Sequence, residues 1–198
     1  MINVSIFASG TGSNAAKIIQ HFKYHPDIRI SLIVSSKATA GVLNIAESHS
    51  IPAITLKRDA FLNTDEYVNL LREKDIKFIV LAGFLWKVPD NLIEAFRDHI
   101  INIHPALLPK FGGKGMYGMF VHEAVKKAGE PVTGITIHKV DEHYDHGDVI
   151  FQAECPVEET DTPESIAKKV QMLEHTWFPV IVEKYISGLE KLNTSKNN

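Results

Sequence analysis

Apolar runs of strand length alternate with segments of helical period over the first half of the chain, and this alternation limits the fold more than any other sequence feature. We expect buried strands at residues 2–7, 28–34, 78–82 and 100–103, and helices at 14–25, 39–49, 64–74 and 90–97. Near-continuous apolar strands are typical of a sheet with both faces covered. The β-α-β-α order predicts parallel strands joined by right-handed crossovers.

The pattern changes after residue 104. Residues 110–119 are rich in glycine and irregular, residues 120–128 have helical period, and residues 132–140 and 149–157 alternate like two strands around a polar loop. Pro163 then opens an amphipathic segment that we expect to be helical to about Ser187, and Asn63 with Glu66 has the spacing of a capping box. We therefore expect an α/β, three-layer, Rossmann-like fold with an open, mostly parallel sheet. A single domain would cover residues 1–190, followed by a polar tail at 191–198.

Composition excludes several classes of function. The net charge of −3 gives no broad positive field, which argues against nucleic acid as a partner. The single cysteine, Cys155, permits no internal disulfide and fits a reducing cytosol. No apolar run reaches the length of a membrane span, and no signal peptide is recognisable. We therefore expect a cytoplasmic protein without a membrane partner.

A glycine-rich loop at residues 8–15 follows the first expected strand and opens the first expected helix. Glycine lets the backbone approach an anion closely, and the free N–H groups of a helix start carry partial positive charge. Gly10, Gly12 and Ala15 also satisfy the loose dinucleotide pattern. The carboxylate that NAD needs near the end of the second strand is missing, although Ser36 and Lys37 could accept the extra phosphate of NADP. The loop predicts anion binding and leaves the identity of the anion open.

Two polar side chains interrupt the apolar strand that ends near residue 103. Asn102 and His104 stand two residues apart, so the period of a strand places both side chains on one face. Pro105 and Pro109 stiffen the chain beyond them. An amide donor beside an ionisable donor suits acyl transfer, because each preorganised donor to the developing oxyanion is worth about 10²–10³ in rate. Histidine can also carry the proton that an attacking amine loses.

An acidic loop with histidines follows the strand expected at 132–140. Histidine and aspartate are common metal ligands, but these groups crowd into one short loop without a CxxC or HExxH spacing, so we expect no metal site. A solvated acidic turn is the plainer interpretation. A third interpretation joins the loop to His104, because a nearby carboxylate would favour the protonated, donating imidazole or position a water. The residues alone do not decide which carboxylate has that role among Asp141, Glu142, Asp145 and Asp148.

Five stretches taken together resemble the folate-dependent formyltransferase family, and within it the branch that formylates glycinamide ribonucleotide (GAR). They are residues 8–14, 81–84, 102–109, 134–150 and 171–175, spread over nearly the whole chain. The Asn-x-His-Pro-x-Leu-Leu-Pro string that starts at Asn102, together with a later Asp-x-Gly, is specific to the family, whereas the glycine loop is not. The Asp-x-Gly pattern falls on Asp145 and Gly147, so the resemblance implies that Asp145 is the partner of His104.

The resemblance also implies the formyltransferase fold and direct transfer of a formyl group from 10-formyltetrahydrofolate, as co-substrate, to the amine of GAR in de novo purine biosynthesis. It implies no permanent cofactor and no metal, with the two small molecules as partners of a monomer or homodimer. The catalytic residues would be Asn102, His104 and Asp145. The residues that bind GAR would be Gly12, Ser13, Asn14, Gln171 and Glu174. Those that bind the folate would be Leu85, Trp86, Lys87, Val88, Asn102, Asp141, Glu142, His143 and Tyr144.

The chain departs from the family pattern mainly on the folate side. Trp86 and Lys87 stand where a basic residue followed by an aliphatic one is common, no arginine near Thr64 matches that of some relatives, and Lys139 replaces a common aromatic residue. The glycine-rich loop at 110–119 is longer than usual. Methionyl-tRNA formyltransferase and formyltetrahydrofolate hydrolase share the catalytic segment but normally carry a further domain, so we expect the GAR branch from the length of this chain.

Overall fold

Strands and helices alternate along the chain in a computed structural model, which describes the backbone of residues 1–196 and the side chains of residues 1–189 and 191. The strands are β1 (Ile2–Ala8), β2 (Ile28–Ser35), β3 (Ala53–Thr55), β4 (Ile76–Leu81), β5 (Ile100–His104), β6 (Val132–Lys139) and β7 (Val149–Pro156). The helices are α1 (Ser13–Phe22), α2 (Gly41–Ser48), α3 (Arg58–Asn63), α4 (Glu66–Glu73), α5 (Asp90–Ala95), α6 (Met119–Ala128) and α7 (Pro163–Lys196).

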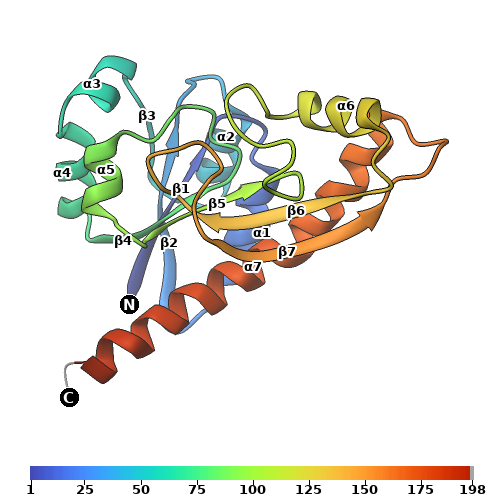
Figure 1. Cartoon of the computed structure of the whole chain (residues 1–198). Coiled ribbons are helices and arrows are strands. Elements are labelled where there is room, and N and C mark those ends of the chain that lie inside the picture. Colours follow the sequence, from blue (N-terminus) through green and yellow to red (C-terminus); the bar gives the residue numbers. More distant parts are fainter. Residues whose placement is uncertain (197–198) are drawn as a thin grey trace.

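The strands form one sheet in the order β3-β2-β1-β4-β5-β6-β7 (Figure 1). Strands β1 to β5 are parallel, whereas β6 pairs antiparallel with β5, and β7 pairs antiparallel with β6. The open, mostly parallel sheet expected from the sequence is therefore confirmed. The strand order reverses between β1 and β4, and open α/β sheets bind ligands beyond the strand ends at such a switch point.

Helices cover both faces of the sheet, which gives the three layers expected from the sequence. Side chains from α1, α2 and α7 pack on one face, and side chains from α3, α4 and α5 pack on the other. Neighbouring residues of β1 show why its end, from Ile6 to Ala8, is apolar on both sides, since Ile6 belongs to the first core and Phe7 to the second. Both side chains are at most 1% exposed.

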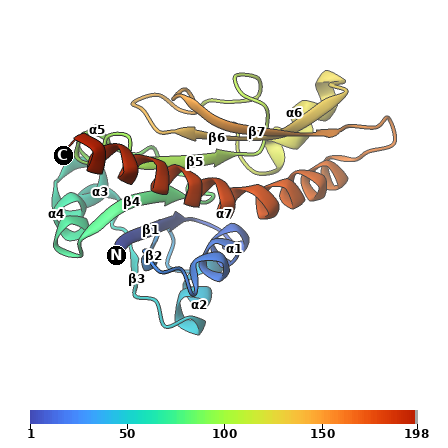
Figure 2. The ribbon, with the colours of Figure 1, turned by 90° about the horizontal axis from the view of Figure 1, so that it is seen from below.

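Helix α7 runs along the sheet and contacts α1, α6, β5, β6 and β7 (Figure 2). Its buried side chains repeat at helical spacing, from Ile166 and Val170 to Phe178, Val182 and Ile186. Pro163 is its first residue, as predicted. The helix continues to Lys196 rather than ending near residue 187, and positions 197–198 of the expected tail lie outside the described residues. No helix in the described part has both the length and the apolar content needed to cross a membrane.

Residues 53–66 differ from the sequence-based expectation. Strand β3 and helix α3 were not predicted. Strand β3 was missed because it is a three-residue edge strand with two exposed residues. The capping box predicted for Asn63 and Glu66 is wrong. Asn63 ends α3 and donates to Asp59 Oδ1 (2.8 Å), while Thr64 Oγ1 accepts the backbone N–H of Glu66 (3.2 Å).

Candidate active site

A cavity of about 900 Å³ opens where β1, β4 and β5 end. The loops after these strands line it, together with the start of α6 and the first part of α7. Two predicted groups of residues meet there. The three predicted catalytic residues and all five predicted GAR-binding residues line this cavity: Asn102, His104, Asp145, Gly12, Ser13, Asn14, Gln171 and Glu174.

The glycine loop turns sharply into α1 on one wall of this cavity. Gly12 has φ 83° and precedes the first helical residue. A Cβ atom at this position would lie 2.8 Å from Val42 Cα, so both the backbone angle and the packing of α2 require glycine. No side chain caps the start of α1, which leaves its N–H groups directed at whatever occupies the cavity.

The alternative of an NADP site loses one of its two predicted phosphate contacts in the structure. Ser36 is only 8% exposed, and its hydroxyl is hydrogen-bonded to the hydroxyl of Ser9 (2.6 Å). Ser9 Oγ also accepts the backbone N–H of Leu85 (3.1 Å). Ser36 therefore joins β2 to the loops after β1 and β4, and its hydroxyl is not available to a cofactor phosphate.

Helix α7 lies beside the glycine loop and contributes to the same wall of the cavity. Asn14 Nδ2 donates to Glu174 Oε2 (2.9 Å), and Gln171 Nε2 lies 3.5 Å from Ser13 Oγ. Burial raises the pKa of the Glu174 carboxyl, and the hydrogen bond from Asn14 only partly opposes this. Asn14 Oδ1 is buried without a partner among the described residues. The pair therefore offers acceptor oxygens to a ligand rich in hydroxyl groups.

His104 lies at the end of β5 and is 3% exposed. Its Nε2–H donates to the carbonyl oxygen of Phe111 (2.7 Å), and its Nδ1 lies 3.6 Å from Asp145 Oδ2. Both ring nitrogens thus face acceptors. The ring is therefore held by one backbone acceptor and has a carboxylate beside its other nitrogen.

Asn102 lies two residues earlier on the same face of β5, and His138 on β6 fixes its amide. His138 Nδ1 donates to the carbonyl oxygen of Lys139 (2.7 Å), so its Nε2 accepts from Asn102 Nδ2 (3.0 Å). Burial lowers the pKa of His138, and this favours the neutral ring that such acceptance requires. The second N–H of Asn102 faces Asp145 Oδ1 at 3.5 Å. This long contact leaves the donor free for a substrate oxygen.

Asp145 reaches His104 from the loop between β6 and β7. The residue has φ 54°, and its Oδ2 accepts the backbone N–H of Gly113 (2.9 Å). Gly147 lets the loop turn back closely, since a Cβ there would lie 2.1 Å from the carbonyl oxygen of Lys139. The structure therefore selects Asp145 from the four carboxylates of the loop as the one beside His104.

A second, smaller pocket of about 70 Å³ lies on the other side of Asn102 and Asp145. Most residues predicted to bind the folate line it, namely Trp86, Lys87, Val88, Asn102, Asp141, His143 and Tyr144. Leu85 lines the larger cavity instead. Glu142 lines neither space and faces Arg97 across 3.7 Å at the surface, so the structure does not bring it to the predicted folate site.

The formyl transferase family model matches residues 2–182 of the chain. The chain belongs to the formyl transferase family. A phosphoribosylglycinamide formyltransferase of Bacillus subtilis is 35% identical over 191 residues, which are 94% of this chain and 95% of that protein.

Plant and structural relatives of this formyl transferase agree with the assignment. The chloroplastic phosphoribosylglycinamide formyltransferase of Vigna unguiculata is 40% identical over 187 residues, 91% of this chain and 59% of that protein. The chain thus spans about six tenths of the length of the plant relatives it matches. The crystal structure of phosphoribosylglycinamide formyltransferase from Bacillus halodurans has a TM-score of 0.84 at 38% identity, covering 93% of this chain and 95% of that one.

Two histidines of this formyl transferase site were not predicted. His138 lies opposite Asn102 in the β5–β6 ladder, and its signal in the sequence was a polar residue that ends an alternating strand. His122, on α6, lines the large cavity and is 5% exposed, with an unpartnered Nδ1 among the described residues. Burial and then the nearby His104 lower the pKa of His122. Its signal was a histidine on the inward face of a short helix.

Proposed function

We propose that this chain transfers the formyl group of 10-formyltetrahydrofolate to the amine of 5′-phosphoribosylglycinamide (GAR), giving formyl-GAR and tetrahydrofolate in de novo purine biosynthesis. The observation that carries the proposal is that Asn102 and Asp145 line both the large cavity and the small pocket. Ligands held on the two sides would meet at these residues. The names of the relatives, phosphoribosylglycinamide formyltransferase, support GAR as the acceptor.

GAR fits the chemistry of the large cavity. Its phosphate would lie on the uncapped N–H groups of Gly12, Ser13 and Asn14, where the helix dipole favours an anion. Its ribose hydroxyls would donate to Glu174, whose buried carboxylate has no cationic partner in the described structure. Gln171 borders the same side of the cavity.

The folate would enter from the small pocket. A volume of about 70 Å³ is below the roughly 300–1,000 Å³ usual for ligand sites, so only part of the folate would enter this pocket. Trp86 supplies an aromatic wall that suits a pterin ring. Asp145, which lines this pocket and lies 3.6 Å from His104 Nδ1, would stand beside the reacting atoms.

The reaction proceeds by direct attack. The amine nitrogen of GAR bonds to the formyl carbon, and the carbonyl electron pair moves onto oxygen. The second N–H of Asn102 would donate to this oxyanion, and the positive charge of a protonated His104, whose ring nitrogens face Phe111 and Asp145, would stabilise it. Asp145 holds His104 and takes the amine proton, directly or through a water. The oxyanion then collapses, the bond from carbon to N10 of the folate breaks, and N10 receives a proton. The formyl carbon keeps its oxidation state, so the transfer needs no redox cofactor.

The same proposal includes the remaining expectations from the sequence. A cytoplasmic location fits the single cysteine, Cys155, whose thiol pKa is raised by burial and which is therefore weakly reactive. The binding partners of the protein would be the small molecules GAR and 10-formyltetrahydrofolate. The oligomeric state, a monomer or a homodimer, stays a prediction, and so does the extent of the single domain, residues 1–190.

An absorbance assay tests the function directly. Loss of the formyl group from 10-formyl-5,8-dideazafolate would be followed with and without GAR, together with the mass of the formylated product. We expect release only when GAR is present. Release without GAR would indicate a hydrolase, and the absence of release under both conditions would refute the proposal.

A further inference from the structure

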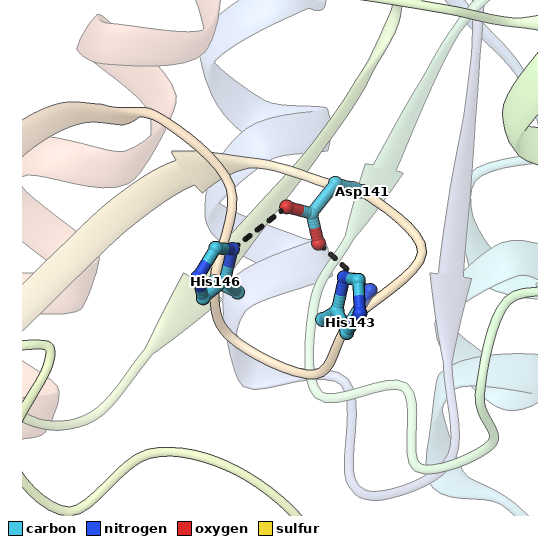
Figure 3. Close-up of side chains that lie close together, drawn as sticks. All are labelled: Asp141, His143 and His146. Carbon is cyan, nitrogen blue, oxygen red and sulfur yellow. Dashed lines mark hydrogen bonds and ion pairs between the residues drawn. The ribbon is translucent and has the colours of Figure 1, made fainter.

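The loop between β6 and β7 carries three metal-binding side chains that take no part in the chemical step proposed above. Asp141, His143 and His146 point toward one another across the loop (Figure 3). One ligand atom from each lies within 4.8 Å of the other two. Within the described part of the chain, no other group of three histidine, cysteine or acidic side chains brings its ligand atoms this close.

The carboxylate of Asp141 forms the fixed corner of this group. Its Oδ1 accepts the backbone N–H of His143 (2.8 Å), and its Oδ2 lies 3.1 Å from His146 Nδ1. The two imidazole rings have centroids 5.5 Å apart. A tetrahedral zinc ion with ligands at about 2.0–2.1 Å holds neighbouring ligand atoms roughly 3.3 Å apart. Small rotations of the rings would close the remaining gap, and the side chain of His146, 75% exposed, is free to rotate.

Several other histidines of the chain are already committed to backbone acceptors or donors. His104 and His138 each direct one ring nitrogen at a backbone carbonyl oxygen. His25 Nδ1 accepts the backbone N–H groups of Asp27 and Ile28. The ring of His143, by contrast, makes no hydrogen bond to any described residue, so it can turn toward a metal without losing a contact.

We propose that Asp141, His143 and His146 bind a divalent cation of the zinc type, with water completing the coordination. Imidazole and carboxylate ligands suit Zn²⁺ and its neighbours in the first transition row. The sequence argued against a metal because the ligands crowd into one short loop without a CxxC or HExxH spacing. A loop that folds back on itself does not need such a spacing, since three ligands within six residues require little chain closure.

The position of the site gives the cation a role. Tyr144 and Asp145 lie between the outer two ligands in sequence, and Asp141 and His143 line the small pocket. A bound cation would therefore order the loop before the folate arrives, and preorganisation strengthens binding. This consequence rests on the proposed function, whereas the metal site itself does not.

Metal binding is tested without either substrate. Protein treated with a chelator and then freed of it would be titrated with Zn²⁺ in competition with a chromophoric chelator. We expect one equivalent to bind, and we expect His143→Ala and His146→Ala each to weaken the affinity at least about tenfold. His49→Ala, which removes another exposed histidine, should leave the affinity unchanged. Absence of binding by the unaltered protein, or unchanged affinity in both loop variants, would overturn the site.

The ordering role has separate readouts. Hydrogen exchange of residues 140–148 should slow on addition of Zn²⁺ in the unaltered protein and not in His146→Ala. The affinity for 10-formyl-5,8-dideazafolate, measured by fluorescence without GAR, should rise with zinc. If zinc binds and both quantities stay the same, the ordering role is wrong. A failure of formyl transfer to GAR would leave the zinc titration fully interpretable.

Discussion

Asp145→Asn removes one charge beside His104 and leaves the shape of the side chain unchanged. Asparagine tolerates positive φ well, so the backbone of the loop at φ 54° keeps its conformation. The amide oxygen can still accept the N–H of Gly113 in place of Oδ2. The variant therefore removes the negative charge and the proton acceptor without changing the fold of the loop.

The magnitude follows from the distance between His104 Nδ1 and Asp145 Oδ2. At 3.6 Å and an effective dielectric constant of about 20, the attraction between two unit charges is about 4–5 kcal/mol. Desolvation of the pair offsets part of this, so we expect a loss of about 3–4 kcal/mol in the transition state, or roughly 10²–10³ in kcat. The KM for GAR should change little, because Asp145 lies away from the glycine loop.

The assay is release of the formyl group from 10-formyl-5,8-dideazafolate at saturating GAR, with Tm measured on the same samples. Asp148→Asn is the matched control, since this carboxylate lies on the same loop, is 81% exposed and pairs only with Lys139 in the described structure. It should retain kcat within about twofold, as expected for an exposed ion pair. A kcat for Asp145→Asn within tenfold of the unaltered protein would refute the proposed role of the carboxylate.

Three further predictions concern the two walls of the cavity. Asn102→Ala should lower kcat by about 10²–10³ through loss of an oxyanion donor, as measured in single-turnover experiments. Inorganic phosphate should compete with GAR. Gly12→Ala should abolish this competition, because the new Cβ would lie 2.8 Å from Val42 Cα and displace the glycine loop. Competition that persists in this variant would place the phosphate of GAR elsewhere. Burial raises the pKa of Glu174 in the folded state. The contribution of this carboxyl to the free energy of unfolding is therefore fully present below its pKa in the unfolded chain, and it is lost as the pH rises through its pKa in the folded protein. Glu174→Gln should therefore raise Tm at pH 7, by up to about 4 °C, while raising the KM for GAR.

The buried strands were predictable because both faces of the sheet are covered. Apart from Asn102 and His104, β5 contains only isoleucine, so these two side chains stood out against an apolar background. The period of a strand then placed both on one face, and both line the cavity. Strand β3 escaped prediction because an edge strand of three residues is under no such demand, and Ala53 and Thr55 are exposed.

The remaining site residues depend on tertiary structure. Four carboxylates of one loop are equivalent in sequence, and only the turn at Asp145 with its N–H contact from Gly113 distinguishes one of them. His138 meets Asn102 through the register of two antiparallel strands 36 residues apart in sequence. Local periodicity contains no information about that register. The family resemblance supplied Asp145 but gave no role to His138.

The two sides of the site differ in how they are built. Asn14 and Glu174 stand on helices α1 and α7, which pack against each other and against the sheet. The side proposed for the folate is made mainly by loops around Trp86 and Tyr144. Substitutions in those loops disturb few core contacts, so they can accumulate between species while the fold persists. An inhibitor that discriminates between relatives of this protein should therefore be directed at the loop side, and one intended to act on all of them at the helical side.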